Sequence, residues 1–203
     1  MIRYLLISAL FCLFVSCKSY QVQDAVSVDN SLQFVQNQYF SDVSLDYVYK
    51  THIEIYGNKM GGIFIAKRIN DTIHRMVLTT DFGNKLLDFE VSESSFKVNF
   101  IIDNVDKKII INTLRDDFRT LLQVNSKVFK TYKRNNEVIY QTEYNAYYYF
   151  DEVSRNLTKI IKTNKRKEKV VFTFDSKKTT FAENINIQHF NIKLKIDFNQ
   201  LSN

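Results

Sequence analysis

Apolar and polar residues alternate with a period of two along most of the chain after residue 44. In the segment Leu45–Ile55, nearly every second residue is apolar, and polar residues such as Asp46 and Glu54 lie between them. This period predicts a β-strand that buries one face. Similar segments follow as far as Ile102 and are separated by short turns, which predicts an antiparallel meander.

The period changes to that of a helix between residues 106 and 123. The apolar positions there recur mostly at steps of three and four residues, namely Ile110, Leu114, Phe118, Leu121 and Leu122. We therefore expect an amphipathic helix over about 106–123, with Asp103 or Asn104 as its N-cap. Its apolar stripe needs a large apolar partner, and we expect that partner to be the concave face of the sheet.

Beyond this helix the period of two resumes and continues toward the C-terminus. Ile185 and Ile187 lie in odd register but the apolar residues of Phe190–Phe198 lie in even register, which predicts a β-bulge near Gln188-His189. A further short helix is expected over Leu32–Phe40. The sequence thus predicts a mainly β fold with one or two helices. About eleven antiparallel strands would form a curved sheet, an open or half β-barrel, with a helix packed in its concavity.

The N-terminal residues have the features of an export leader. Arg3 precedes the apolar run Leu5–Val15, which is too short to span a bilayer. The run ends in Phe14-Val15-Ser16-Cys17, which resembles the lipobox of bacterial lipoproteins. This resemblance implies cleavage between Ser16 and Cys17 and a lipid anchor on Cys17, through which the protein would hold the membrane.

The same resemblance implies a location and a domain organisation. Lys18 follows Cys17 where Asp would mark retention in the inner membrane, so the outer membrane is expected, with the domain facing the periplasm. We expect residues 1–16 to be the lipoprotein signal peptide. Residues 17–43 would form the lipidated N-terminus, a tether and the short helix, and residues 44–203 a single half-barrel domain.

The composition supports a strand-rich fold and excludes several function classes. Among 203 residues there are 12 Tyr and 17 Phe, but no Pro and only 4 Gly. Aromatic and β-branched residues favour strands. The few glycines match no phosphate-binding loop, and no cofactor is expected.

A basic stretch stands out in the C-terminal part of the chain. The formal net charge is +6, and the densest cluster of cations is Lys162, Lys165, Arg166, Lys167 and Lys169. Either a solvated hairpin tip or a surface that attracts anionic lipid head groups or an acidic partner would explain this cluster. Nucleic acid is excluded as a partner because an exported protein does not ordinarily meet it.

Candidate catalytic residues are few, and we expect no enzyme and no metal site. The histidines, His52, His74 and His189, have no zinc-ligand spacing and are expected to be solvated or locally bonded strand residues. The adjacent carboxylates of Asp116-Asp117 and Asp151-Glu152 point in different directions on a helix or a strand. They are therefore expected to be solvated charges.

The run Tyr147–Phe150 is expected on a strand. Tyr148 and Phe150 would then face one way and Tyr147 and Tyr149 the other, so that one pair fills the core and one covers the outer face, or one pair lines a ligand cleft.

The whole pattern resembles the LolA/LolB-type lipoprotein carriers and the small uncharacterised lipoproteins grouped with them. The segments Gly62–Lys67, His74–Gly83 and Lys85–Phe89 carry most of the likeness. The resemblance implies an open half-barrel whose apolar concavity holds acyl chains beneath a helical lid. The residues expected to line this concavity are Phe89, Val98, Phe100, Leu114, Phe118, Leu121, Tyr148, Phe172 and Ile192.

Two functions from different classes remain open. The first is binding of a lipid or another hydrophobic ligand in the concavity, with a carrier-like role. The second is a non-catalytic structural or interaction subunit of a cell-envelope assembly, in which the same aromatic side chains fill a closed core.

Overall fold

A computed structural model describes residues 20–30, 32–164 and 166–201 of the chain. Within these residues the fold is a 14-stranded antiparallel sheet with one α-helix, α2 (Lys108–Leu122). The strands are β1 (Val26–Val28), β2 (Phe34–Gln36), β3 (Asp46–Ile55), β4 (Asn58–Arg68), β5 (His74–Thr79), β6 (Lys85–Val91), β7 (Phe96–Ile101), β8 (Asn125–Arg134), β9 (Glu137–Thr142), β10 (Ala146–Asp151), β11 (Leu157–Thr163), β12 (Glu168–Asp175), β13 (Asn184–His189) and β14 (Leu194–Gln200).

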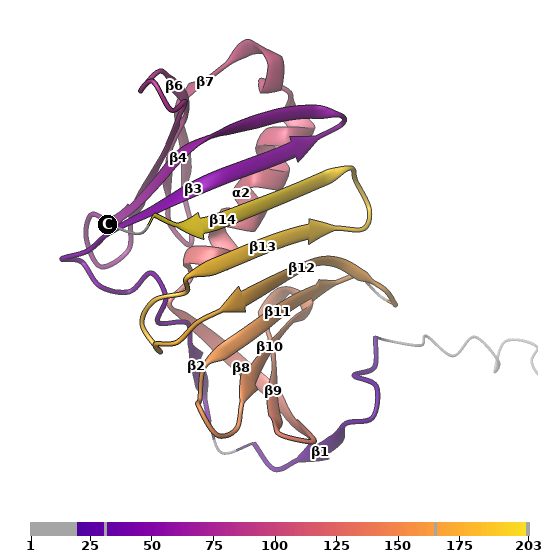
Figure 1. The fold of residues 1–203 in the computed structure, drawn as a ribbon. Helices are drawn as coiled ribbons and strands as arrows, with labels where there is room; N and C mark the ends of the chain where they lie inside the picture. The colour runs from indigo at the N-terminus through magenta and orange to yellow at the C-terminus, as the bar shows by residue number, and fades with distance from the viewer. Residues whose placement is uncertain (1–19, 31, 165, 202–203) are drawn as a thin grey trace, which may run out of the picture.

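The sheet is strongly curved and is not closed. Its strand order is β1-β8-β9-β10-β11-β12-β13-β14-β3-β4-β5-β6-β7, and β2 pairs with β8 beside β1. One edge is therefore β7, and the other is formed by β8 with the short strands β1 and β2. Figure 1 shows the twisted sheet curling from β7 at the top to β8–β11 at the bottom. This is the curved, open antiparallel sheet that the sequence predicts.

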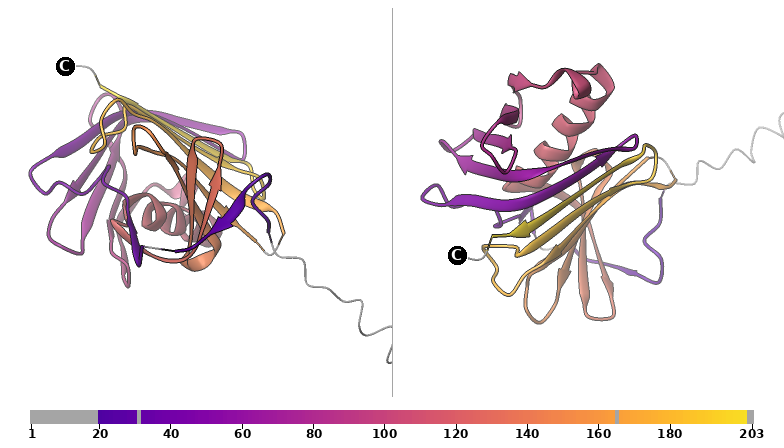
Figure 2. Two further views of the ribbon diagram at one scale, coloured as in Figure 1. Left: turned by 90° about the horizontal axis from the view of Figure 1, so that it is seen from below. Right: turned by 45° about the horizontal axis from the view of Figure 1, so that its top comes forward.

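α2 connects the two edges of the sheet and lies in its concavity. The chain leaves edge strand β7, passes through the 3-10 turn Asp103–Val105 and α2, and enters β8 at the other edge. Seen from below, the helix lies inside the curve of the sheet (Figure 2, left). Ile110, Leu114 and Phe118 belong to the main hydrophobic core. The predicted docking of one amphipathic helix in the concavity is thus confirmed.

The helix begins without the expected cap. Its N-cap is Lys107, whose side chain makes no capping hydrogen bond, and Asp103 and Asn104 lie in the preceding 3-10 turn instead. The predicted N-cap is therefore wrong. The 3-10 turn explains the difference, because Asp103 and Asn104 belong to it and the α-helix begins only at Lys108.

The structure has three strands more than the predicted eleven or so: β1 in the expected tether, β2, and one from the division of the last predicted strand into β13 and β14. The expected bulge near Gln188-His189 is a tight turn, after which β14 pairs back on β13 as a hairpin. This turn reverses the chain between His189 and Leu194, so the change of register marks a second strand. The expected helix over Leu32–Phe40 is also wrong, because this segment contains β2. Pairing with the free edge of β8 satisfies the backbone there.

The segment expected as a tether is part of the folded domain. Val35, Tyr39 and Phe40 are buried in the main core. Tyr20, Val22 and Ala25 pack on a second cluster on the outer face of the sheet, so the structure places residues 20–43, apart from the undescribed residue 31, within the domain. The proposed signal peptide and the candidate lipidation site, Cys17 with Ser16 before it, lie outside the described residues.

The aromatic strand β10 contributes to both faces of the sheet. Tyr148 is in the main core, and half-buried Phe150 packs against the same core. Tyr147 and Tyr149 form the second cluster with Ile139 and Ile161. The first alternative for this run is confirmed in this form: one pair faces the core and the other the outer face, where the N-terminal segment covers it.

One buried histidine, His74, ties the N-terminal segment to the sheet, so the expectation that it is solvated or locally bonded is wrong. The Nε2–H of His74, at the start of β5, donates to the carbonyl of Phe40 at 2.9 Å. Burial lowers the pKa of His74 below 6.5, and the nearby charge of Arg68 acts in the same direction. The neutral imidazole is therefore the form that the fold favours.

We expect His74 to make the protein sensitive to acid. Below pH 6.5 the unfolded chain takes up a proton before the folded chain does, so the free energy of unfolding falls by at most about 1.4 kcal/mol per pH unit from this residue. His74→Gln, which keeps a donor for Phe40, should reduce this slope between about pH 7.5 and about pH 5.5 in urea denaturation. His52→Gln, at an exposed position, is the control. Equal slopes for all three proteins would contradict the prediction.

Candidate functional site

The helix in the concavity has two different surroundings. On the side of β3–β6 it packs on a wholly apolar set of side chains, and on the side of β11–β13 it contacts a buried polar cluster. Both regions are possible only because α2 crosses from one sheet edge to the other, where residues far apart in the sequence meet it. The two regions are the candidate site.

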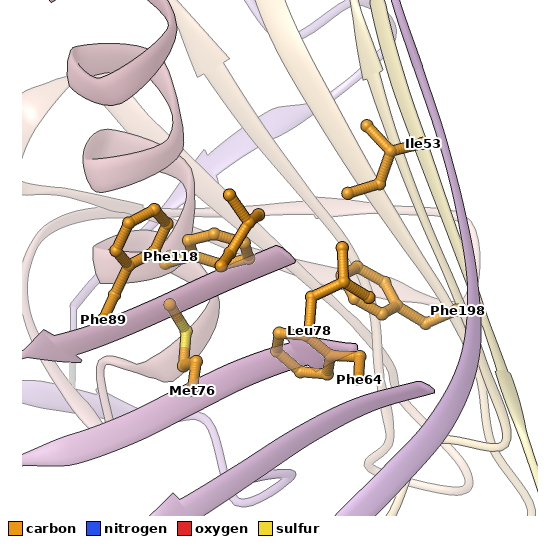
Figure 3. Close-up of a pocket in the computed structure, with 8 residues that line it drawn as sticks. Ile53, Phe64, Met76, Leu78, Phe89, Phe118 and Phe198 are labelled. Carbon is orange, nitrogen blue, oxygen red and sulfur yellow. The ribbon is translucent and has the colours of Figure 1, made fainter. Parts of the chain in front are cut away.

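A small apolar void lies between α2 and the strands. It is lined by Ile53, Phe64, Met76, Leu78, Leu87, Phe89, Phe118 and Phe198. Figure 3 shows the side chains from the strands gathered around Phe118 of the helix. The ring of Phe118 stacks on that of Phe64 with centroids 5.9 Å apart, and it lies 6.3 Å from the ring of Phe89.

The void is small because these side chains fill the concavity. Its volume is about 10 Å³, which is about the space that one water-sized sphere occupies. An acyl chain does not fit this space as it stands. A ligand would have to displace α2 or some of the aromatic side chains.

The residues expected to line the concavity have different environments. Phe89 and Phe118 line the apolar void, and Tyr148 lines a polar pocket described below. Leu114, Leu121 and Phe172 are buried in the core but line neither the void nor the pocket, and Ile192 is half-buried in the β13–β14 turn.

Val98 and Phe100 were predicted wrongly, because they do not lie in the core. They are 38% and 42% exposed. Both lie on edge strand β7, where a bulge shifts the register so that Phe100 pairs with Asp88 and Val98 with Phe89. Phe100 thereby leaves the face that Phe89 occupies. The alternation of β7 gave no sign of this bulge, whereas the missed lining residues, such as Ile53 and Leu78, do follow the period of two.

A buried acid–base pair joins α2 to β13. The Nε2–H of His189 donates to Oδ2 of Asp117 at 2.7 Å, and the two side chains are 1% and 2% exposed. Burial raises the pKa of the Asp117 carboxyl, and the hydrogen bond from His189 opposes this rise. The Nδ1 atom of His189 is buried and has no hydrogen-bond partner among the residues that the structure describes.

This pair corrects two expectations. Asp117 is not a solvated charge, although its neighbour Asp116 is half-exposed and pairs with Arg115. His189 is bonded across 72 residues of sequence rather than locally. The two neighbouring side chains point in different directions, as expected, but that of Asp117 points into the core.

Lys162 lies beside this pair and not on the exposed basic surface. Its ammonium group donates to Oγ1 of Thr120 at 2.8 Å, and burial lowers its pKa while the charge of Asp117 opposes the shift. It borders a polar pocket of about 20 Å³, lined by Thr120, Gln123, Ser126, Thr142, Glu143, Tyr144, Ala146, Tyr148 and Lys162.

The rest of the basic stretch is at the surface. Arg166 and Lys167 are exposed and Lys169 is half-buried, whereas Lys165 lies outside the described residues. The inward position of Lys162 follows from the strand, because its side chain lies on the same face as that of Ile160, two residues before it.

The described parts of the chain contain neither a cluster of metal-ligating side chains nor a helix that could span a membrane. No three His, Cys, Asp or Glu side chains gather there as metal ligands would. No helix among those residues is long and apolar enough to span a membrane.

Comparisons with known proteins give remote similarities. No protein-family model matches the chain. Uncharacterized protein L711 of Acanthamoeba polyphaga mimivirus is 29% identical over 160 residues, which cover 74% of this chain but only 42% of that protein. The chain therefore spans less than half the length of this relative. A solved Vibrio parahaemolyticus domain, named for outer-membrane lipoprotein sorting, superposes with a TM-score of 0.44 at 7% identity, covering 77% of this chain and 83% of that one.

We expect Phe118 to be a main contributor to the docking of α2. Phe118→Ala removes a buried ring and should lower the free energy of unfolding by about 3–5 kcal/mol. Ile109→Ala, on the exposed side of the same helix, should change it by less than about 1 kcal/mol. Chemical denaturation measures both, and equal small effects would show that the helix is not docked.

We also expect the two neighbouring aspartates of α2 to differ sharply. Asp117→Ala leaves His189 buried without its partner and should cost about 3–5 kcal/mol. Asp116→Ala breaks only a surface ion pair and should cost at most about 1 kcal/mol. Chemical denaturation measures the free energy of unfolding of both variants, and an equal loss for Asp116→Ala and Asp117→Ala would contradict the structure.

Proposed function

We propose that the protein is a lipoprotein of the outer membrane that faces the periplasm and binds an acyl chain or another hydrophobic ligand between α2 and the sheet, in a carrier-like role. The observation that supports ligand binding most directly is the apolar void. Its lining contains no polar side chain, and it lies where the helix meets an open sheet. Ligand sites of this kind are apolar concavities at the junction of secondary-structure elements.

Of the two ways to make room for a ligand, displacement of α2 or of aromatic side chains, the proposal takes the first, in which α2 acts as a movable lid. The N-terminal end of the helix lacks favourable capping and charge, since Lys107 and Lys108 put positive charge at the positive end of the helix dipole and no acidic residue lies in the first turn. The C-terminal half is tied by Asp117 to His189, and the side chain of Asn37 donates to the carbonyl of Leu121 at 2.9 Å. The helix would therefore swing about its C-terminal half.

A second function is favoured by the small size of the same void. If the aromatic side chains simply fill the concavity, the domain is a structural or interaction subunit of an envelope assembly. Its outer surface would then carry the function.

The proposal includes no catalysis. A His–Asp pair often serves as a general base, but here both side chains are enclosed beneath α2. A substrate would reach them only after the helix had moved away and had thereby broken the pair.

Ligand binding can be tested with a fluorescent fatty acid. The wild-type protein should bind it saturably, and Phe118→Ala should bind it about tenfold more tightly, because the deleted ring leaves room beneath the helix. Ile109→Ala should bind like the wild type. Two outcomes would contradict the proposal and favour the structural function. One is the absence of saturable binding by the wild type, and the other is a Phe118→Ala affinity equal to that of the wild type.

Lipidation can be tested separately in cells. Palmitate should label the wild-type protein, and Cys17→Ala should remove the label, because no other cysteine follows the leader. Cys12→Ala is the matched control and should be labelled like the wild type. Undiminished labelling of Cys17→Ala would contradict the anchor.

A further inference from the structure

Three neighbouring hairpin tips at one end of the sheet carry exposed aromatic and basic side chains. The β3–β4 tip has Tyr56, the β13–β14 tip has Phe190 and Lys193, and the β11–β12 tip has Arg166 and Lys167. We call these five residues the aromatic–basic rim. Figure 1 shows the three tips on the same side of the molecule.

The three tips form one continuous surface. The backbone N–H of Tyr56 donates to the carbonyl of Lys193 at 2.8 Å, and that of Phe190 donates to the carbonyl of Lys169 at 3.0 Å, at the start of β12. Among the described residues, no carboxylate forms an ion pair with a cation of the rim. At the opposite end of the sheet, by contrast, Lys133 pairs with Glu152.

The backbone at Tyr56 is unusual for such a bulky residue. Its φ is +48°, in the left-handed region, and Gly57 follows with φ +85°. Asn or Asp is the usual residue at such a turn position, since a large side chain there is strained. A tyrosine held outward in this conformation suggests that its exposed ring serves a purpose other than folding.

The first described residue, Tyr20, lies beside the same rim. The hydroxyl of Tyr20 donates to Oε1 of Glu168 at 3.1 Å, and its ring lies 5.0 Å from that of Tyr147. Glu168 is the first residue of β12, next to Lys167. Cys17 precedes Tyr20 by three residues in the sequence. A lipid on Cys17 would therefore hold this end of the domain against the bilayer.

We propose that the aromatic–basic rim docks on an anionic lipid surface and so fixes the orientation of the domain on its membrane. Tyrosine is enriched at the level of the lipid head groups, an exposed phenylalanine inserts at the boundary with the acyl chains, and lysine and arginine are attracted to anionic lipids. The orientation rests on the proposed lipidation of Cys17. The affinity of the rim for anionic lipid does not, and each can be tested without the other.

The affinity is measured on the unlipidated Cys17→Ser protein with vesicles of phosphatidylcholine alone or mixed with phosphatidylglycerol. We expect binding to the mixed vesicles that weakens with salt. The double variant Arg166→Glu/Lys167→Glu should bind at least about tenfold more weakly. Lys177→Glu/Lys178→Glu, at the opposite end of β12, is the matched control and should bind like the parent. Equal affinity of the two double variants, or no preference for phosphatidylglycerol, would overturn the proposal.

The orientation is measured on the lipidated protein in the mixed vesicles. Fluorescent labels are attached to Phe190→Cys and to Val153→Cys, an exposed site at the opposite end of the sheet. Lipid-borne quenchers should quench the label at 190 and leave that at 153 unaffected. Equal quenching on protein shown by mass spectrometry to carry lipid would overturn the docking. Protein that carries no lipid would contradict the anchor, while the vesicle experiment still decides the affinity of the rim.

Discussion

Burial of one face of α2 in the curved sheet is the contact on which the rest of the structure depends. A twisted sheet of this length curls but does not close, so its concave face has no second sheet to cover it. The crossing from β7 to β8 must span the open side, and an amphipathic helix makes this crossing while covering the apolar side chains. Phe118 is central, because it meets the rings of both Phe64 and Phe89. The segment that crosses from β7 to β8 is therefore also the element that covers the concave face.

The polar cluster determines how this helix sits. Apolar packing alone tolerates small rotations of a helix on a sheet, whereas the bond between Asp117 and His189 is directional and buried on both sides. A misplaced helix would leave a buried carboxyl or imidazole unpaired, which costs several kcal/mol. Lys162 adds a cation whose charge favours ionised Asp117. The cluster therefore favours one position for the C-terminal half of α2, whereas the uncapped N-terminal end has no comparable restraint.

The sequence predicts local periods well and long-range partners poorly. The alternation in β3 and β4 and the helical period around Phe118 identify the sheet, the helix and the apolar face, because each depends on neighbouring residues only. The exposure of Phe100 depends on a bulge at an edge strand. The hydrogen bond between Asp117 and His189 joins positions 72 residues apart, so no local sequence pattern predicts it. Most of the candidate site depends on such long-range contacts. Its apolar part, which follows the local period of two, is easier to predict than its polar part.

Strand β10 separates the two proposed activities of the domain. Tyr148 faces the core, whereas Tyr147 and Tyr149 face outward, where Tyr20, Val22 and Ala25 pack on their cluster. Lys159 lies 4.5 Å from the centre of the Tyr149 ring and strengthens this outer contact. The proposed membrane attachment would thus use the hairpin tips and the segment packed on the outer face, and the proposed lid would use the concave face. Because Tyr148 and Tyr147 lie on opposite faces of β10, a movement of α2 would leave the packing of Tyr20 on Tyr147 in place.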